Sequence, residues 1–272
     1  MQPTHNTNNS RPKVKIESAY YNETQIISIY AEKGGVSKSN SVLGLSGGLR
    51  YLGVKHLLID TDPFSRTITA RYGLLNSRDD LRAVCMGRIP VKEAIHEVDP
   101  LVSVIPASVE LEELDRSEEL DFEPIFQELS DMGEYQIILI DLPPGRSDFA
   151  WESLVNSDWV LVPTKAEMDS AITMRATERR IWEVKKVNPA LRWLGCVVTM
   201  YQSRTVNSKI MLQQLKASLD GKIPVLRTIL PLTTVVAESA LHQVNVVAYA
   251  PNSKASQGYV ELAKEILEII GG

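Results

Sequence analysis

The chain contains 272 residues, of which 44% are hydrophobic and 23% charged, and its formal net charge is −5. Such a chain can bury one large core, and its charge excludes a globally basic protein, so any DNA contact would need a local patch. Two widely separated cysteines in apolar surroundings, Cys85 and Cys196, suit reduced core thiols and a cytoplasmic location. No apolar run approaches the roughly 18 residues of a membrane span, and the N-terminus lacks a signal peptide's apolar stretch.

Residues 1–22 are polar and contain little that could be buried, which predicts a flexible tail in front of one domain over residues 23–272. Arg11, Lys13 and Lys15 make this tail mildly basic. The basic residues fit either a tether for an acidic partner or a solvated leader.

The stretch 31–40 lies between an apolar run at 25–30 and an amphipathic run at 42–52. Strand, glycine-bearing turn and helix start form the layout of a phosphate cradle, in which backbone N–H groups and the positive end of a helix meet an anion. Lys38 suits terminal phosphates and the Ser39 hydroxyl suits Mg²⁺. The usual pattern would place glycines where this chain has Glu32 and Ser37. A plain Gly-Gly turn therefore stays open as the alternative.

Two further strands end in acid. The run 55–60 ends in Asp60 and continues through Thr61 to Asp62, and the strongly apolar run 135–141 ends in Asp141. A carboxylate at the carboxyl end of a parallel strand points into the crevice where open α/β sheets bind ligands, and it suits magnesium and water contacts. A strand-capping Asp-Pro turn explains the first pair equally well. His56, interpreted as a polar residue at a strand edge, receives no role.

The rest of the chain alternates between strand and helix patterns. Further strands are predicted at 101–106, 159–162, 194–200 and 225–229, and helices at 66–72, 79–86, 91–95, 109–116, 122–129, 168–187, 206–219, 234–241 and 256–270. Strands that alternate with helices predict the α/β class: a mostly parallel, twisted sheet flanked by helices on both faces.

Five segments together resemble the deviant Walker A P-loop ATPases of the ParA/MinD family, most closely the ParA-type partition ATPases. They are the loop with its early lysine (33–39), the second motif (58–63), a Walker B-like strand (138–144), a late strand and loop (195–205) and a C-terminal segment (237–256). The resemblance covers about residues 24–270, and five ordered motifs are far more specific than any one of them.

The resemblance implies an ATPase that binds ATP and Mg²⁺ and forms a homodimer around the nucleotide. Lys33 would reach the phosphates bound by the partner subunit, and Asp62 would orient the attacking water. Ser39, Asp60 and Asp141 would support the metal. The remaining expected contacts are catalytic Lys38, the cradle residues Gly34, Gly35, Val36, Ser37 and Asn40, with Gly34 allowing close subunit approach, and Met200 and Pro231 near the adenine.

Three residues depart from the family pattern. Ser37 replaces a glycine, and if its backbone conformation favours glycine the strain would be about 1–3 kcal/mol. We therefore expect ATP binding with slow hydrolysis. Asn40 replaces a hydroxyl residue. Phe64 stands where glutamine is common, and this change argues against switching that a partner stimulates in the usual way.

The resemblance also implies two partners: a small ParB-like or cargo-linked adaptor protein, and DNA. Family arginines of the late strand have become Leu232 and Val235, while basic residues remain at Arg204, Lys209, Lys216, Lys222 and Arg227. This predicts weak, salt-sensitive DNA binding and then nucleoid association, with scattered solvated lysines as the alternative. The closing helix carries Glu261, Glu265 and Glu268, so we expect it to dock on the sheet and not on a membrane.

Two functions follow. The first is a switch ATPase that segregates or positions plasmid DNA, chromosomal DNA or another cargo. The second is a nucleotide-stabilised scaffold that hydrolyses little or no ATP because of Ser37.

Overall fold

The computed structural model describes residues 23–115 and 120–272. The predicted tail at 1–22 lies outside this range. An eight-stranded sheet in the order β3-β4-β2-β5-β1-β6-β7-β8 runs through the molecule. Its strands are β1 (Gln25–Ile29), β2 (His56–Asp60), β3 (His96–Asp99), β4 (Val102–Ile105), β5 (Ile137–Asp141), β6 (Trp159–Lys165), β7 (Arg192–Tyr201) and β8 (Val225–Pro231).

All neighbouring strands pair in parallel except β3, which pairs antiparallel with β4 at one edge. This confirms the predicted mostly parallel sheet. The sequence analysis missed β3, because its residues His96, Glu97, Val98 and Asp99 are mainly polar and it is a four-residue edge strand. An edge strand has one unpaired side, so it needs little apolar character.

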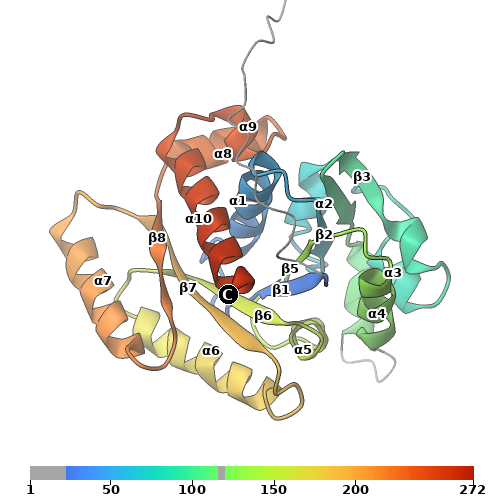
Figure 1. The fold of residues 1–272 in the computed structure, drawn as a ribbon, viewed down its shortest axis with the longest axis horizontal. Coiled ribbons are helices and arrows are strands. Elements are labelled where there is room, and N and C mark those ends of the chain that lie inside the picture. The colour runs from blue at the N-terminus through green and yellow to red at the C-terminus, as the bar shows by residue number, and fades with distance from the viewer. Residues whose placement is uncertain (1–22, 116–119) are drawn as a thin grey trace, which may run out of the picture.

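Ten α-helices are described within these ranges, and they cover both faces of the sheet (Figure 1). They are α1 (Lys38–Tyr51), α2 (Thr67–Arg71), α3 (Leu81–Cys85), α4 (Glu123–Asp131), α5 (Asp148–Val155), α6 (Ser170–Val184), α7 (Val206–Leu219), α8 (Thr234–Leu241), α9 (Val246–Tyr249) and α10 (Lys254–Gly271). The segments η2 (Val91–Ala94) and η3 (Val109–Leu114), predicted as helices, form 3₁₀ helices. Helices α5 and α9 were not predicted.

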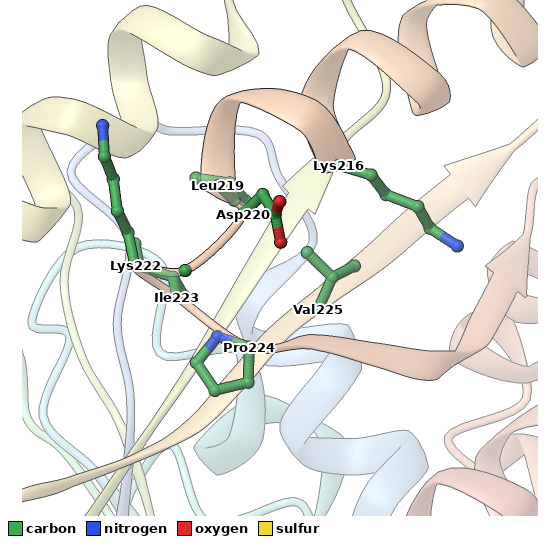
Figure 2. Close-up of a pocket in the computed structure, with 8 residues that line it drawn as sticks. Lys216, Leu219, Asp220, Lys222, Ile223, Pro224 and Val225 are labelled. Atoms are coloured by element: carbon green, nitrogen blue, oxygen red, sulfur yellow. The ribbon is translucent and has the colours of Figure 1, made fainter.

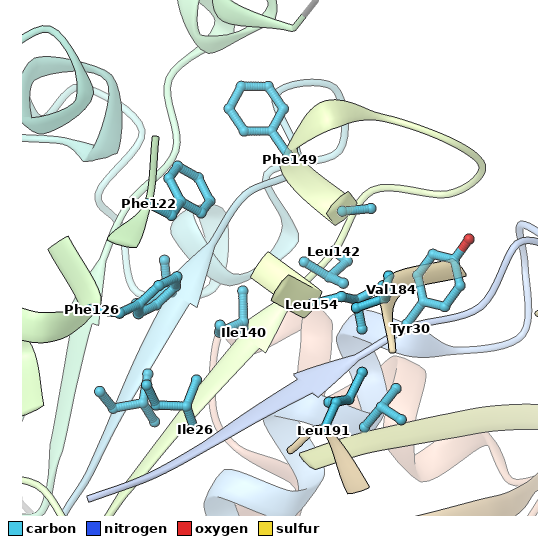
Figure 3. Close-up of a cluster of buried hydrophobic side chains, with 14 of the residues drawn as sticks. Ile26, Tyr30, Phe122, Phe126, Ile140, Leu142, Phe149, Leu154, Val184 and Leu191 are labelled. Atoms are coloured by element: carbon cyan, nitrogen blue, oxygen red, sulfur yellow. The ribbon is translucent and has the colours of Figure 1, made fainter. Parts of the chain in front are cut away.

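Each face of the sheet has its own apolar core. One contains side chains of α3, α4, α5, α6 and α7, and Figure 3 shows its aromatic part, where Phe122, Phe126 and Phe149 lie together. The other contains side chains of α1, α2, α9 and α10. In β5, Ile138 and Ile140 enter the first core while Ile137 and Leu139 enter the second. A strand between two cores needs apolar residues on both sides, which explains its continuous apolar run.

Helix α10 packs on β8 of the sheet, as expected for the closing helix, and also on α1, which was not predicted. Leu262, Ala263 and Ile266 are fully buried. A Cβ atom at Gly48 of α1 would collide with the Tyr259 carbonyl oxygen of α10. The absence of a side chain at Gly48 therefore lets the two helices approach closely and fixes how the phosphate-loop helix lies on the sheet.

Two polar residues lie deeper than predicted. His56 belongs to an internal strand and not to a sheet edge: its ring is fully buried, with Nε2 2.7 Å from Ser46 Oγ and Nδ1 2.9 Å from the Val54 carbonyl oxygen. Glu265, predicted on the polar face of the closing helix, is also buried and accepts hydrogen bonds from the backbone N–H groups of Arg227 and Thr228 in β8. Both positions are explained by hydrogen bonds to distant backbone or side chains, which sequence periodicity does not reveal.

Candidate nucleotide site

The predicted phosphate loop and both acid-ended strands meet at one end of the sheet. Strand β5 lies between β1 and β2, and Asp141 is in register with Ile29 on one side and with Asp60 on the other. The loop from β1 to α1 begins directly beyond Ile29. Three segments that are far apart in the sequence therefore form one crevice at the carboxyl ends of the strands, where open α/β sheets bind ligands.

Backbone conformation in the loop is shaped for an anion. Gly35 has φ 72° and Ser37 has φ 71°, both in the left-handed region. Ser37 is the N-cap of α1 but its side chain forms no cap hydrogen bond, and the first turn of α1 contains no acidic residue. Within the described chain, no acceptor is found for the first backbone N–H groups of this helix. A helix N-terminus with free N–H groups attracts negative charge.

Lys38 and Asp141 are buried without a direct ion pair. Lys38 is 8% exposed, and its burial lowers the pKa of its ammonium group, against the opposing influence of Asp141 and Asp62. Neither carboxylate oxygen of Asp141 forms a hydrogen bond of normal geometry in the described structure. Burial, followed by the charge of Asp60, raises the pKa of Asp141, against an opposing contribution from the Ser39 hydroxyl. A buried lysine without an ion pair and a buried carboxylate without a well-formed hydrogen bond are costly unless a ligand compensates them.

The neighbouring aspartates differ from Asp141 because their oxygens are occupied. Asp60 Oδ2 accepts hydrogen bonds from the backbone N–H and the hydroxyl of Thr69, at 2.9 and 2.8 Å. Asp62 accepts from the backbone N–H groups of Phe64 and Ser65 and from the Ser65 hydroxyl. Asp60 thus anchors the segment after β2, and Asp62 is held beside the crevice by its own turn.

The Lys33 side chain forms ion pairs with acidic residues of its own chain. Its Nζ lies 2.7 Å from Asp169 and 3.3 Å from Glu167, the residues that precede α6. The hydrogen bond with Asp169 raises the pKa of Lys33 and lowers the pKa of Asp169. Sequence analysis placed Asp169 inside the helix predicted at 168–187 and missed the contact, because nothing in the sequence relates positions 33 and 169.

A cavity of about 420 Å³ joins the loop to the other half of the sheet. Met200 and Pro231, the two residues expected near an adenine, both line it, together with Ser37 and Asn40. Thr199, to which the sequence analysis gave no role, donates its hydroxyl to the carbonyl oxygens of Val36 and Thr164 and so ties the phosphate loop to the sheet. A lone threonine at the end of an apolar strand was the only available signal. The other lining residues are mainly apolar: Leu230, Leu232, Thr233, Val236, Ala237, Ala240, Ala255 and Tyr259.

The basic residues considered for DNA do not all belong together. Arg204, Lys209 and Lys216 are exposed on α7 and the turn before it. Lys216 and Lys222 flank a surface cavity at the end of α7, with Asp220 between them (Figure 2). Arg227 instead pairs with Glu268 at 2.5 Å and with Glu265 at 3.4 Å. Since two carboxylates neutralise it, Arg227 adds little to a basic surface.

The site has the architecture of a P-loop nucleotide-binding protein. The family model described as an AAA domain matches residues 24–193. The chain is 30% identical to the chromosome-partitioning ATPase Soj of Thermus thermophilus, with 89% of this chain and 94% of that protein covered. It is 29% identical to the chromosome partitioning protein ParA of Caulobacter vibrioides, with 90% and 95% covered.

A solved structure agrees with these relatives. The septum site-determining protein MinD of Pyrococcus horikoshii, complexed with Mg-ADP, is 26% identical, superimposes with a TM-score of 0.76, and is covered over 99% of its length by 92% of this chain. The chain therefore belongs to the ParA/MinD family of P-loop ATPases. Among the described residues, none of the helices combines the length and apolarity that a bilayer crossing requires.

Proposed function

We propose that this protein is a cytoplasmic, ATP-dependent switch ATPase of the ParA type, which dimerises on ATP and works with an adaptor protein to position DNA or another cargo. One observation carries the proposal: among residues 23–115 and 120–272, buried Lys38 has no ion pair and buried Asp141 has no well-formed hydrogen bond, beside a helix N-terminus without a side-chain cap. A polyphosphate would supply the negative charge that Lys38 and the helix lack, and a magnesium ion would compensate Asp141.

The residues present fit Mg-ATP. The Ser39 hydroxyl and Asp141 would hold the cation, with Asp60 behind them, and the backbone of Gly35, Val36 and Ser37 would surround the phosphates. No group of three or more acidic, histidine or cysteine side chains within residues 23–115 and 120–272 could hold a metal by itself. Phosphate oxygens would therefore have to complete the coordination, as is usual for Mg²⁺. The bound cation would neutralise the charge that develops on the phosphates.

The cavity beside Met200 and Pro231 supports adenine as the base. Guanine presents adjacent N–H donors that call for a carboxylate or a similar acceptor pair. No acidic side chain lines the cavity. The cavity lining offers no carboxylate to accept both of these donors, so we expect ATP to bind at least about tenfold more tightly than GTP.

Asp62 and Lys33 would complete the reaction. Asp62 is 6% exposed and faces the same crevice as Lys38, whose pKa it raises. It would orient the attacking water. Lys33 would leave Asp169 and Glu167 to reach the phosphates of the second subunit, with Gly34 at the contact between the subunits. Dimerisation would then report the presence of the terminal phosphate.

The effect of Ser37 on hydrolysis distinguishes a switch ATPase from a nucleotide-stabilised scaffold. Its left-handed φ of 71° is costly for a residue with a side chain, by about 1–2 kcal/mol. A Ser37→Gly variant relieves the strain and removes the hydroxymethyl group beside the phosphates, so we expect single-turnover ATP hydrolysis to become several-fold faster with unchanged ATP affinity. If wild-type protein leaves bound ATP intact for hours and the glycine variant does so too, the scaffold is the better description.

A weak contact with DNA is proposed for Arg204, Lys209 and Lys216, which lie on one helix and its leading turn and have no ion-pair partners among the described residues. A gel shift with ATP at low salt tests it. The expected complex dissociates as the salt concentration rises, and the variant Lys209→Glu/Lys216→Glu loses it. If this variant shifts DNA equally, α7 does not form the DNA-binding surface.

A further inference from the structure

The outer surface of α6 carries large apolar side chains that nothing in the described structure covers. Ile172 is 70% exposed and Trp182 is 61% exposed. The helix lies at the lower edge of the molecule in Figure 1, between α5 and α7, which both contact it. An exposed tryptophan and isoleucine on one helix mark an interaction surface more often than an isolated apolar residue does.

These side chains form one stripe. Ile172, Arg175, Arg179 and Trp182 are exposed and follow one another at three, four and three residues. At about 100° per residue they fall on one side of the helix. The opposite side carries the buried residues Ser170, Met174, Thr177, Ile181 and Val184, which face the core. The stripe is therefore the part of α6 that points most directly away from the sheet.

The arginines of the stripe are unpaired, in contrast to their neighbour. Arg180 bonds to Glu183 at 3.4 Å and its guanidinium lies 4.5 Å from the centre of the Trp151 ring. Arg175 and Arg179 have neither an ion pair nor a hydrogen bond with any residue of 23–115 or 120–272. Two free guanidinium groups between apolar ends complement a surface that is acidic in its middle and apolar at its ends.

We propose that this stripe, Ile172–Arg175–Arg179–Trp182, is the docking surface for an acidic amphipathic helix of a partner protein. Such a helix would place carboxylates against Arg175 and Arg179 and one apolar side chain on each end of the stripe, about 15 Å apart. The two arginines interrupt the apolar surface, whereas a helix that inserts into lipid needs a continuous apolar face. A contact of this size is small, so the complex is transient and of micromolar affinity.

The surface and the nucleotide site are linked through the turn before α6. Asp169 and Glu167, which hold Lys33, directly precede the helix. The docking proposal itself does not depend on the proposed function, since it rests on the exposed side chains alone. Nucleotide binding by each variant is measured separately, so a failure of one proposal is distinguishable from a failure of the other.

The test uses the full chain and a fluorescent peptide of about five helical turns, in which leucine and glutamate alternate at helical spacing. We expect saturable binding at low salt, weakened at least about tenfold by Arg175→Glu/Arg179→Glu and several-fold by Trp182→Ala. The matched control is Arg78→Glu/Arg88→Glu, which makes the same charge change at exposed arginines elsewhere and should bind within about twofold of wild type. All substituted side chains are exposed, and thermal melts verify that each variant is folded.

Several results would overturn the proposal. They are no saturable binding of the acidic peptide by the wild-type chain, an equal loss in the control variant, and equal binding of a peptide with lysine in place of glutamate. Tighter binding of phosphatidylcholine–phosphatidylglycerol vesicles or duplex DNA through the same arginines would assign the stripe to a membrane or a nucleic acid instead, and self-association abolished by Trp182→Ala would assign it to a second copy of the chain.

Discussion

Two groups of aspartates at the same end of the sheet differ in whether their carboxylate oxygens are hydrogen-bonded. The segment after β2 gives every oxygen of Asp60 and Asp62 a hydrogen-bond donor from its own chain. At the phosphate loop, within the part of the chain that the structure describes, Asp141 has no well-formed hydrogen bond and Lys38 has no ion pair. The first arrangement stabilises the local fold. The second costs free energy because its buried charges are not paired, and a charged ligand can remove that cost.

The first prediction distinguishes these two kinds of buried aspartate. Asp60→Asn should lower the free energy of unfolding by about 2 kcal/mol, because an amide group cannot accept all of the bonds from Thr69 and Asp62. Asp141→Asn should leave the unfolding free energy of the nucleotide-free protein unchanged, or raise it by up to about 1 kcal/mol, because it removes a buried charge that accepts no well-formed hydrogen bond. Urea denaturation without nucleotide measures both. An equal loss in the two variants would contradict the comparison.

A second prediction concerns His56, which is buried and satisfied like Asp60. Burial lowers its pKa from 6.5 to about 4. Between these pH values the unfolded chain binds the proton and the folded chain does not, so the contribution of His56 to stability is lost as the pH falls from 6.5 to 4. The loss is at most about 3 kcal/mol. Because the raised pKa of Asp60, about 6, acts in the opposite direction over an overlapping range, the wild type must be compared with His56→Asn. The stability difference should shrink with acidification; a constant difference would mean that His56 titrates normally.

The smallest effect concerns Lys33. Exposed ion pairs are weak because solvent screens them, so Asp169→Asn should lower the ATP concentration needed for half-maximal dimerisation by no more than about fivefold. Sedimentation across an ATP titration measures this. Lys264 pairs with Glu261 on α10, so Glu261→Gln removes a comparable exposed pair and serves as the control. A higher ATP requirement in Asp169→Asn would mean that Asp169 aids dimerisation and does not restrain Lys33.

Much of this fold is predictable from the sequence, for local reasons. Helices α7 and α8 begin and end at the predicted residues, and their starts are fixed locally because the side chains of Thr205 and Thr233 accept N–H bonds from the first turn. The strands ending in Asp60 and Asp141 were likewise identified by their apolar runs. Helix α9 has only four residues, and β3 is short and polar. Patterns of that length carry too little periodicity to be recognised.

The site was predictable in its residues but not in its contacts. Lys38, Ser39 and Asp141 follow from the motifs, and the strained backbone of Ser37 follows from the position of a missing glycine. The bonds of Asp60 to Thr69, of Thr199 to Val36 and of Lys33 to Asp169 join positions that no local pattern relates. They arise from the way the loops and helices fold back onto the ends of the strands, which the sequence alone does not provide.

The central claim is that Lys38 binds the phosphates of a nucleotide and that Asp141 binds its cation. Calorimetric titration of the wild-type chain with ATP, in the presence and absence of Mg²⁺, tests this claim most directly. The account predicts saturable, Mg²⁺-enhanced binding, weakened about 100-fold by Lys38→Ala, and loss of the Mg²⁺ enhancement in Asp141→Asn. Binding of equal strength in Lys38→Ala, or no saturable binding by a folded wild-type chain, would contradict it.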